Sequence, residues 1–156
     1  MPTYRSHVLV CGGTGCVAGG SQAVQSRMKE ELAKKGLDKE ILVVQTGCHG
    51  MCELGPIVVV YPEGTFYTRV QPEEAKTIVE EHLYKGRVVE KLLYRPSEKM
   101  ESVKHYNELP FYSKQHRIAL RNCGYINPDN IEEYIARDGY QALAKVLLEM
   151  TPDDVI

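Results

Sequence analysis

The sequence predicts an α/β fold whose first half follows the order β-α-β-β-β-α and whose last part is a short, mostly helical segment. Short apolar, β-branched runs that stop at glycine or at a turn indicate strands. Longer stretches with apolar residues three or four positions apart indicate helices. With 156 residues, 43 % of them hydrophobic and 26 % charged, the chain has the composition of a globular protein.

The first two strands are expected to be parallel neighbours. Residues 6–12 and 41–47 form the two apolar runs, and residues 21–36 between them carry a helical pattern. Ser21 can cap the start of this helix and Gly36 can end it. The side chains expected on its buried face are Val24, Met28 and Leu32. A helical crossover joins parallel strands, so the carboxyl ends of both strands should lie at one edge of the sheet.

A hairpin and a second helix complete this part of the chain. Residues 57–61 and 66–70 are strand-like, and the turn residues 62–65 between them predict a hairpin. Residues 72–86 are expected to form a helix with Pro72 in its first turn, where proline is tolerated. The side chains expected on its buried stripe are Ala75, Ile78, Val79 and Leu83.

The chain is expected to have three parts. Residues 1–86 form the α/β domain, residues 87–111 have only weak periodicity and are expected to be a connector, and residues 112–156 form a helical unit. This last unit has too few apolar residues for an independent core. It is therefore predicted to be the incomplete start of a larger domain.

Helix signals support this interpretation of the last unit. Asn127 is expected to cap one helix, and residues 140–150 are expected to form another. The side chains expected to be buried on the second of these are Leu143, Val146 and Leu147. Thr151 begins a further capped turn close to the last residue of the sequence.

Charge and hydropathy bear on which partners and which compartment are expected. A net charge of −2 does not favour a nucleic-acid partner. No apolar run approaches the ~20 residues of a membrane span, and the first residues have no secretory-signal pattern. The five cysteines are therefore expected in a reducing, cytoplasmic compartment, where clustered thiols more often bind metal or do redox chemistry than form structural disulfides.

Four cysteines form two pairs with metal-ligand spacing. Cys11 and Cys16 enclose four residues after the first strand, and Cys48 and Cys52 enclose three residues after the second. Because the two strands are expected to be parallel neighbours, both cysteine loops should meet at one edge of the sheet. The four thiolates are therefore candidate ligands of a metal centre.

Three kinds of site fit these thiols. A [2Fe–2S] cluster needs two thiolates per iron, and the glycine-rich loops let backbone N–H groups approach its sulfurs. A zinc ion would make the chain a structural or interaction module that uses the same four cysteines. Thiol–disulfide exchange is the third kind, although neither pair has the usual C-x-x-C spacing. The residues favour the cluster and leave the other two open.

The segments VCGGTGC, GCHGMC and GPIVVVYPEGTFY resemble the thioredoxin-like [2Fe–2S] ferredoxin family, whose element order is the one expected here. The resemblance implies that one [2Fe–2S] cluster is bound by Cys11, Cys16, Cys48 and Cys52. It also implies an electron-transfer module that is not a catalyst on its own. Gly55-Pro56 lies where such folds place a cis-proline, which the sequence does not decide.

Residues 114–143 resemble the start of the flavin-binding subunit of respiratory NADH dehydrogenase. They are closer still to the matching subunit of NAD(P)-linked, electron-bifurcating [FeFe]-hydrogenases. This resemblance implies electron transfer between a flavin or NAD(P)H site and other iron–sulfur carriers, with other iron–sulfur and flavin subunits as partners. FMN, NAD(H) and a [4Fe–4S] cluster are expected only in the remainder of such a subunit or in partners, because GxGxxG and C-x2-C-x2-C patterns are absent. Homo-oligomerisation is left open.

Four further residues lie near the cysteine pattern or outside it. His49 lies inside the second cysteine loop and is expected to be a loop residue beside the cluster, with a ligand or tuning role as the alternative. Met51 and Leu54 are candidates for shielding the cluster from water. Cys123 lies outside both pairs and is expected to be a packing cysteine.

Overall fold

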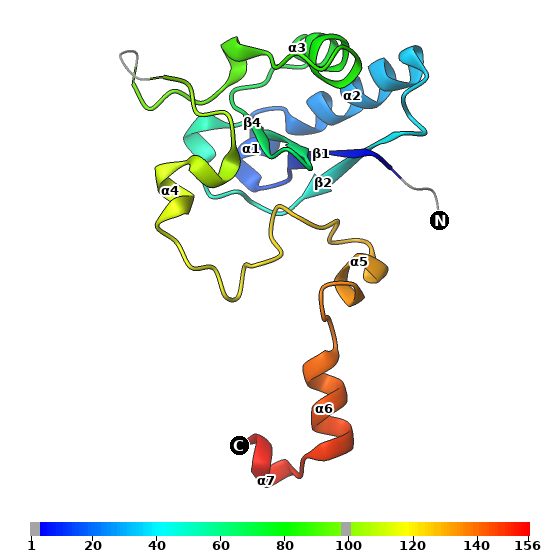
Figure 1. Ribbon diagram of the computed structural model, residues 1–156, viewed down its shortest axis with the longest axis vertical. Coiled ribbons are helices and arrows are strands. Elements are labelled where there is room, and N and C mark those ends of the chain that lie inside the picture. The colour runs from blue at the N-terminus through cyan, green and yellow to red at the C-terminus, as the bar shows by residue number, and fades with distance from the viewer. Residues whose placement is uncertain (1–3, 98–100) are drawn as a thin grey trace. The chain divides into compact units, whose positions relative to one another are not determined.

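The protein is described here by a computed structural model, which covers residues 4–97 and 101–156 (Figure 1). The chain divides into two compact units, residues 4–125 and residues 126–156. The first unit is built on a four-stranded mixed sheet, and the second consists of short helices. This is the α/β fold that the sequence predicts.

The sheet has the strand order β2-β1-β3-β4. β1 (Ser6–Cys11) pairs in parallel with β2 (Ile41–Thr46), as the helical crossover predicts. β3 (Val58–Tyr61) runs antiparallel to β1 on its other side and forms the expected hairpin with β4 (Thr65–Tyr67). The cysteine-bearing strands are therefore direct neighbours, and both end at the same edge.

Three α-helices follow strands of this sheet in the chain. α1 (Thr14–Ala18) was not expected from the sequence, whereas α2 (Ser21–Lys35) and α3 (Glu74–Thr77) were. α3 continues directly into a π-type helical segment, Ile78–Tyr84, so that one helical stretch follows the hairpin. None of the helices that the structure describes combines the length and the apolar character needed to cross a membrane.

The ends of α2 confirm one expectation and correct another. Gly36 follows the helix in the left-handed region with φ 68°, as expected for a glycine that ends a helix. Ser21 is the first helical residue and not the cap, because Gly20 occupies the cap position at φ 93° and no side chain bonds the free N–H groups. The chain leaves α1 through this left-handed glycine, and Ser21 is buried instead.

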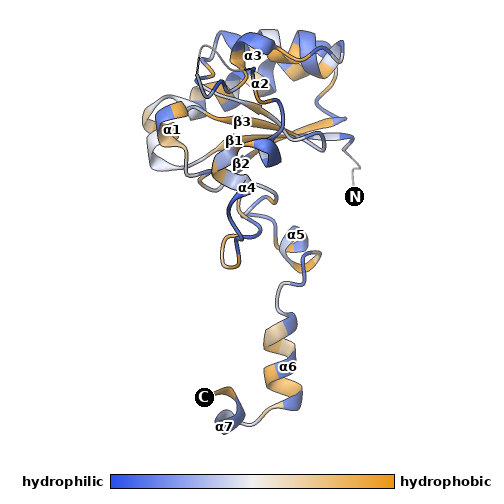
Figure 2. Ribbon diagram, turned by 60° about the vertical axis from the view of Figure 1, so that its left-hand side comes forward, coloured by the Kyte–Doolittle hydropathy of each residue, from blue (hydrophilic) through white to orange (hydrophobic). Residues whose placement is uncertain are grey.

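The first hydrophobic core lies between the sheet and the pair α2 and α3, which cover one face side by side (Figures 1 and 2). The expected helix stripes are confirmed, since every one of their side chains is buried. The sheet residues Val8, Val10, Val58 and Val60 face this layer. Because side chains alternate along a strand, the neighbours of these valines must point to the other face.

The other face of the sheet has its own cover. Leu9, Val59 and Phe66 point to this face, and all three are buried. A turn of 3-10 helix, Tyr106–Glu108, and α4 (Pro110–Ser113) lie over them. The covering side chains are Tyr106, Leu109 and Tyr112. Residues 105–112 therefore cover the face of the sheet that α2 and α3 leave open.

The connector packs along the free edge of β4. After a short 3-10 turn, Glu90–Leu92, the backbone of Leu92 accepts a hydrogen bond from Thr68 N–H at 2.9 Å. Further along, the carbonyl of Lys104 accepts one from Phe66 N–H at 3.0 Å. The edge of the sheet is therefore covered, and the first compact unit extends beyond residue 111, where the sequence suggests that the connector ends.

The second unit contains α5 (Ile131–Ile135), α6 (Gln141–Glu149) and α7 (Pro152–Val155). The residue expected to cap α5 was wrong, because Asn130 and not Asn127 accepts the hydrogen bond from the first turn. The Asn127 side chain instead accepts from Asp129 N–H at 3.0 Å in a local turn.

The burial expected in the second unit is not observed. Leu143 is 50 % exposed and Leu147 73 % exposed, so their expected burial is wrong. No side chain of residues 126–156 is buried, because this unit has no second layer against which its helices could pack. The expected Thr151 cap is confirmed as a complete capping box with Asp154.

The buried Tyr67 hydroxyl ties β4 to the helical layer and supports a stability prediction. It lies 2.9 Å from Nδ1 of His82 and accepts a hydrogen bond from Val89 N–H at 3.1 Å. Tyr67→Phe leaves both partners buried without a hydrogen bond, so we expect the free energy of unfolding to fall by about 1–3 kcal/mol. Denaturant unfolding measures the loss. Tyr84→Phe is the matched control because Tyr84 is 60 % exposed, and an equal loss in both variants would contradict the assignment.

The same His82 predicts a pH dependence of stability. Burial lowers the pKa of His82, Lys104 acts in the same direction, and the Glu63 carboxylate opposes them. Because the unfolded chain binds this proton more readily, stability is full above about pH 6.5 and declines as the pH falls below that value.

Thermal unfolding between about pH 7.5 and pH 5.5 brackets the ordinary histidine pKa and tests this dependence. We expect the His82→Gln variant to lose less stability over this interval than the wild type. His116→Gln removes an exposed histidine and should leave the full dependence in place. An unchanged dependence in His82→Gln would refute the role of His82.

Candidate metal centre

The four paired cysteines meet at the shared edge of β1 and β2. Cys11 is the last residue of β1 and stands opposite Thr46, the last residue of β2. Cys16 lies on α1, and Cys52 opens a 3-10 turn, Cys52–Leu54, that contacts α1. The parallel register therefore brings together the two cysteine loops, which are more than thirty residues apart in the sequence.

The thiols influence one another electrostatically. Burial, together with the neighbouring Cys11 and Cys52 thiols, raises the pKa of Cys16 to about 12. The pKa of Cys52 is also raised, first by Cys48 and to a smaller extent by Cys11. Four thiolates can therefore be held together here only if cations compensate their charge.

Glycines bring the backbone of each loop against the sulfur of the other. A Cβ atom on Gly13 would lie 2.8 Å from Sγ of Cys48, and one on Gly55 would lie 2.7 Å from Sγ of Cys16. The N–H of Gly50 donates a hydrogen bond to Sγ of Cys48 at 3.3 Å. Only glycine allows this approach, so the glycine-rich composition of the loops has a structural reason at these positions.

This donor set fits a two-iron cluster. Among the neighbouring thiols, Cys11 acts most strongly on the pKa of Cys16 and Cys48 on that of Cys52, a pairing that would give two thiolates to each of two irons. In the described part of the chain, no three His, Cys, Asp or Glu side chains are placed to hold one common metal ion.

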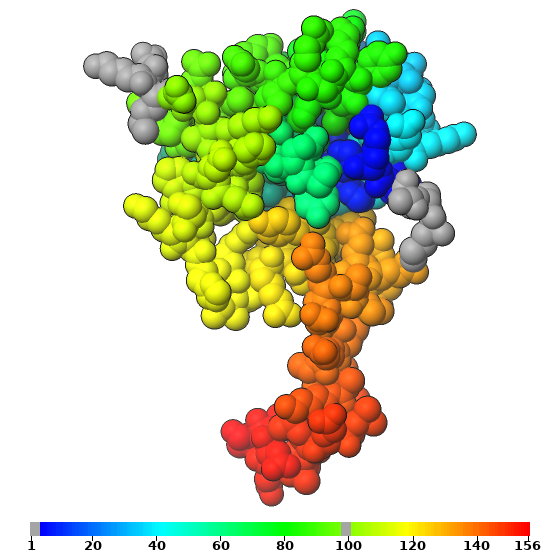
Figure 3. All heavy atoms as spheres, in the orientation of Figure 1, coloured from blue at the N-terminus to red at the C-terminus, as the bar shows by residue number. Residues whose placement is uncertain are grey.

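A segment far along the chain packs on the second cysteine loop. The hydroxyl of Tyr112 donates a hydrogen bond to the carbonyl oxygen of His49. The thiol of Cys123 donates to the carbonyl oxygen of Cys48 at 3.1 Å. The yellow atoms in Figure 3 belong to this segment, which we call the cover segment and define as residues 105–125.

His49 is packed away from solvent, under the cover segment. Its ring is 3 % exposed and meets the rings of Phe66 and Tyr106 edge to face. Neither ring nitrogen has a hydrogen-bond partner among the described residues. Burial, helped by the charge of Arg117, lowers the pKa of His49 to about 4, so the ring is neutral at pH 7. The structure therefore packs the ring of His49, a residue of the second cysteine loop, among aromatic side chains.

The remaining candidates have clear positions. Cys123 is half-buried, and burial raises the pKa of its thiol. Met51 and Leu54 are both partly buried. Met51 packs against the apolar cluster under the cover segment, and the carbonyl oxygen of Leu54 accepts a hydrogen bond from the N–H of Arg69 at 2.8 Å. The Gly55–Pro56 peptide bond, left undecided by the sequence, is cis.

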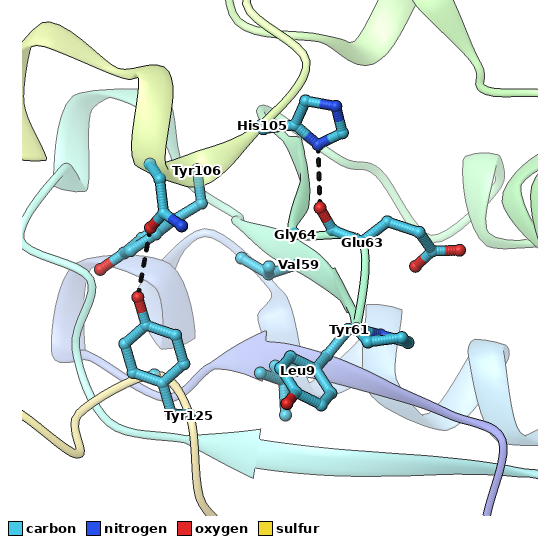
Figure 4. A pocket seen from close by; sticks show the side chains of 11 residues that line it. Leu9, Val59, Tyr61, Glu63, Gly64, His105, Tyr106 and Tyr125 are labelled. Carbon is cyan, nitrogen blue, oxygen red and sulfur yellow. Dashed lines mark hydrogen bonds between the residues drawn. The ribbon is translucent and has the colours of Figure 1, made fainter. Parts of the chain in front are cut away.

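The cover segment is anchored beside a small pocket of about 100 Å³ (Figure 4). Nδ1 of His105 lies 2.8 Å from the carbonyl oxygen of Glu63 in the hairpin turn. The hydroxyl of Tyr125 donates to Oδ1 of Asn107 at 3.4 Å, which closes the segment on itself. Sequence reasoning did not identify this cover, because its helical turns are only three and four residues long and show no periodicity from which a packing partner could be predicted.

Comparison with known proteins agrees with the fold. Residues 1–83 match the family described as thioredoxin-like [2Fe-2S] ferredoxin. A 2Fe-2S ferredoxin of Clostridium pasteurianum is 39 % identical over 102 residues, which are 59 % of this chain and 98 % of that protein. The crystal structure of the wild-type thioredoxin-like [2Fe-2S] ferredoxin from Aquifex aeolicus has a TM-score of 0.54 at 36 % identity, over 59 % of this chain and 98 % of that one.

A third relative is similar over a shorter stretch. Over 43 residues, 28 % of this chain and 9 % of the relative, the sequence is 60 % identical to the NADP-reducing hydrogenase subunit HndC of Solidesulfovibrio fructosivorans. By class, the fold and its converging thiols define an iron–sulfur electron carrier. The chain belongs to the thioredoxin-like [2Fe-2S] ferredoxin family, and its cofactor is one [2Fe–2S] cluster.

Proposed function

We propose that Cys11, Cys16, Cys48 and Cys52 bind the [2Fe–2S] cluster, and that the chain passes single electrons inside a multisubunit, NAD(P)-linked oxidoreductase of the hydrogenase type. The electrons would move between a flavin or NAD(P)H site and other iron–sulfur carriers. The observation that carries the proposal is the convergence of both cysteine loops at the end of the parallel strands β1 and β2.

The chain's own residues would divide the work of holding the cluster. Cys11 and Cys16 are buried and would hold its inner side, whereas Cys48 and Cys52 are exposed and would hold its outer side. The cluster supplies reversible one-electron transfer when it is bound. The Gly50 N–H that points at Sγ of Cys48 favours added negative charge, which is one way a protein sets a cluster's reduction potential. The exposed outer side is where a redox partner could approach.

The proposed context rests on the 60 % identity to a hydrogenase subunit, together with the exposed apolar side chains of the second unit. FMN, NAD(H) and a [4Fe–4S] cluster would be bound by partner subunits or by another part of such an enzyme. All five cysteines are free thiols, which agrees with a reducing, cytoplasmic compartment.

The test begins with protein expressed and purified without air. Iron, acid-labile sulfide and zinc are assayed, and the visible spectrum and the EPR spectrum of the dithionite-reduced protein are recorded. We expect near two irons and two sulfides per chain and a spin-half signal. Stoichiometric zinc in a colourless protein would overturn the cluster proposal.

A second experiment tests the partner separately. The loaded protein is mixed with NADPH and the purified flavin-binding subunit of an NADP-reducing hydrogenase, and bleaching of the cluster absorbance is followed. We expect bleaching only when the flavin subunit is present. A loaded protein that dithionite reduces, but that this mixture leaves oxidised, would overturn the hydrogenase context while the cluster assignment stands.

A further inference from the structure

Arg117 of the cover segment is held by three aromatic rings. Its guanidinium carbon lies 5.4 Å from the ring centres of Tyr106 and Tyr112 and 5.6 Å from that of Tyr125. These distances are within the range of cation–π attraction, which contributes about 0.5–1 kcal/mol at exposed sites and more where water is excluded. Three such contacts fix the position of a charged group that would otherwise sample many rotamers.

Two further contacts connect this guanidinium to the second cysteine loop. Nη1 of Arg117 donates a hydrogen bond to the carbonyl oxygen of Cys123 at 3.3 Å. The thiol of Cys123 in turn donates to the carbonyl oxygen of Cys48 at 3.1 Å. Tyr112, one of the three rings, is bonded through its hydroxyl to the carbonyl of His49. The positive charge is therefore tied to the loop that holds Cys48 and Cys52.

Among the residues that the structure describes, no carboxylate forms an ion pair with Arg117. Within residues 4–97 and 101–156, the partners of Arg117 are the three tyrosines and the one carbonyl oxygen. The nearest exposed arginine in the same segment is Arg121, for which the structure shows no such cage. A fixed positive charge that is tied through Cys123 to the backbone of Cys48 favours reduction of a cluster bound there, because reduction adds one negative charge.

We propose that Arg117, held by Tyr106, Tyr112 and Tyr125 against the second cysteine loop, raises the reduction potential of the [2Fe–2S] cluster. It acts through its charge and is not one of the proposed ligands. The step is the uptake of one electron from the donor without a proton, and Arg117 keeps its charge throughout. The inference rests on the four cysteines as ligands, and it does not depend on which protein is the redox partner.

The experiment is a dithionite titration of the loaded full chain, with the cluster followed by its visible spectrum. Arg117→Gln removes the charge, Arg117→Lys retains it, and Arg121→Gln is the matched control on the same segment. We expect Arg117→Gln to lower the equilibrium constant for reduction about tenfold, a shift of about −59 mV for one electron. Arg117→Lys and Arg121→Gln should stay within a factor of about three of the wild type, or less than about 30 mV.

Iron content and the EPR spectrum of each variant separate this inference from a merely structural role. An Arg117→Gln protein with full iron content and an unshifted potential would overturn the inference. If Arg117→Gln does not retain the cluster, Arg117→Lys decides, because a shift as large as tenfold with the charge retained would exclude the electrostatic explanation. A wild-type chain that binds no iron would overturn the ligand assignment instead.

Discussion

Replacing Cys48 with alanine is expected to reduce the iron content from near two per chain to near zero. Each iron of a [2Fe–2S] cluster needs two thiolates, and the proposed pairing leaves Cys52 alone on its iron after this change. Alanine is preferred to serine, because a serine oxygen could still act as a ligand. Cys48 is exposed, so its replacement should not disturb the packing of the apoprotein.

Cys123→Ala is the matched control for this experiment. Cys123 is the fifth cysteine and contacts the backbone of Cys48 without belonging to the proposed ligand set. Iron and sulfide assays, visible absorbance and thermal unfolding should show a loaded, stable Cys123→Ala protein and a colourless Cys48→Ala protein. Equal iron contents in the two variants would refute the ligand assignment of Cys48.

Gly13→Ala is expected to weaken cluster binding strongly while leaving the cluster-free fold intact. Gly13 has φ −62° and ψ 149°, so alanine is allowed by its backbone. The added Cβ would lie 2.8 Å from Sγ of Cys48. In the apoprotein this sulfur can rotate away, which leaves only a close contact of 3.1 Å with Cβ of Cys48. As a ligand the sulfur cannot rotate, so overpacking of about 1–3 kcal/mol should appear mainly in the loaded state.

Gly19→Ala tests whether any alanine near the first cysteine loop has this effect. Its Cβ would lie no closer than 3.4 Å to another atom, an ordinary contact. Reconstitution with iron and sulfide should load Gly19→Ala like the wild type and Gly13→Ala only partly, while both apoproteins unfold at similar temperatures. A fully loaded Gly13→Ala protein would show that the loop has room at the sulfur.

Much of the fold followed from patterns that are local in the chain. Residues 21–36 and 72–86 show apolar periodicity, and the structure buries the expected faces of both helices. The crossover between residues 6–12 and 41–47 predicted a parallel pair, which the register of β1 and β2 confirms. The convergence of the two cysteine loops followed from that pair, because parallel strands end at the same edge.

The wrong predictions concern features that depend on distant contacts or on competition between two neighbouring cap residues. α1 is a single short turn whose five residues carry too little periodicity to stand out. Asn127 and Asn130 are both good caps, and the local turn made by Asn127 left the helix start to Asn130. Leu143 and Leu147 lie at helical spacing, but periodicity does not supply the layer that would bury them.

By itself, the sequence determined the α/β order, the parallel neighbours and the four thiols that meet at one edge, because each depends on short-range pattern and strand direction. The tertiary structure decided what lies over those thiols. Tyr106, Tyr112 and Arg117 come from a segment without periodicity. The hydrogen bond from Tyr112 to His49 joins residues that are more than fifty positions apart in the chain. Such contacts are selected by the exposed apolar face of the sheet, which exists only once the strands have paired.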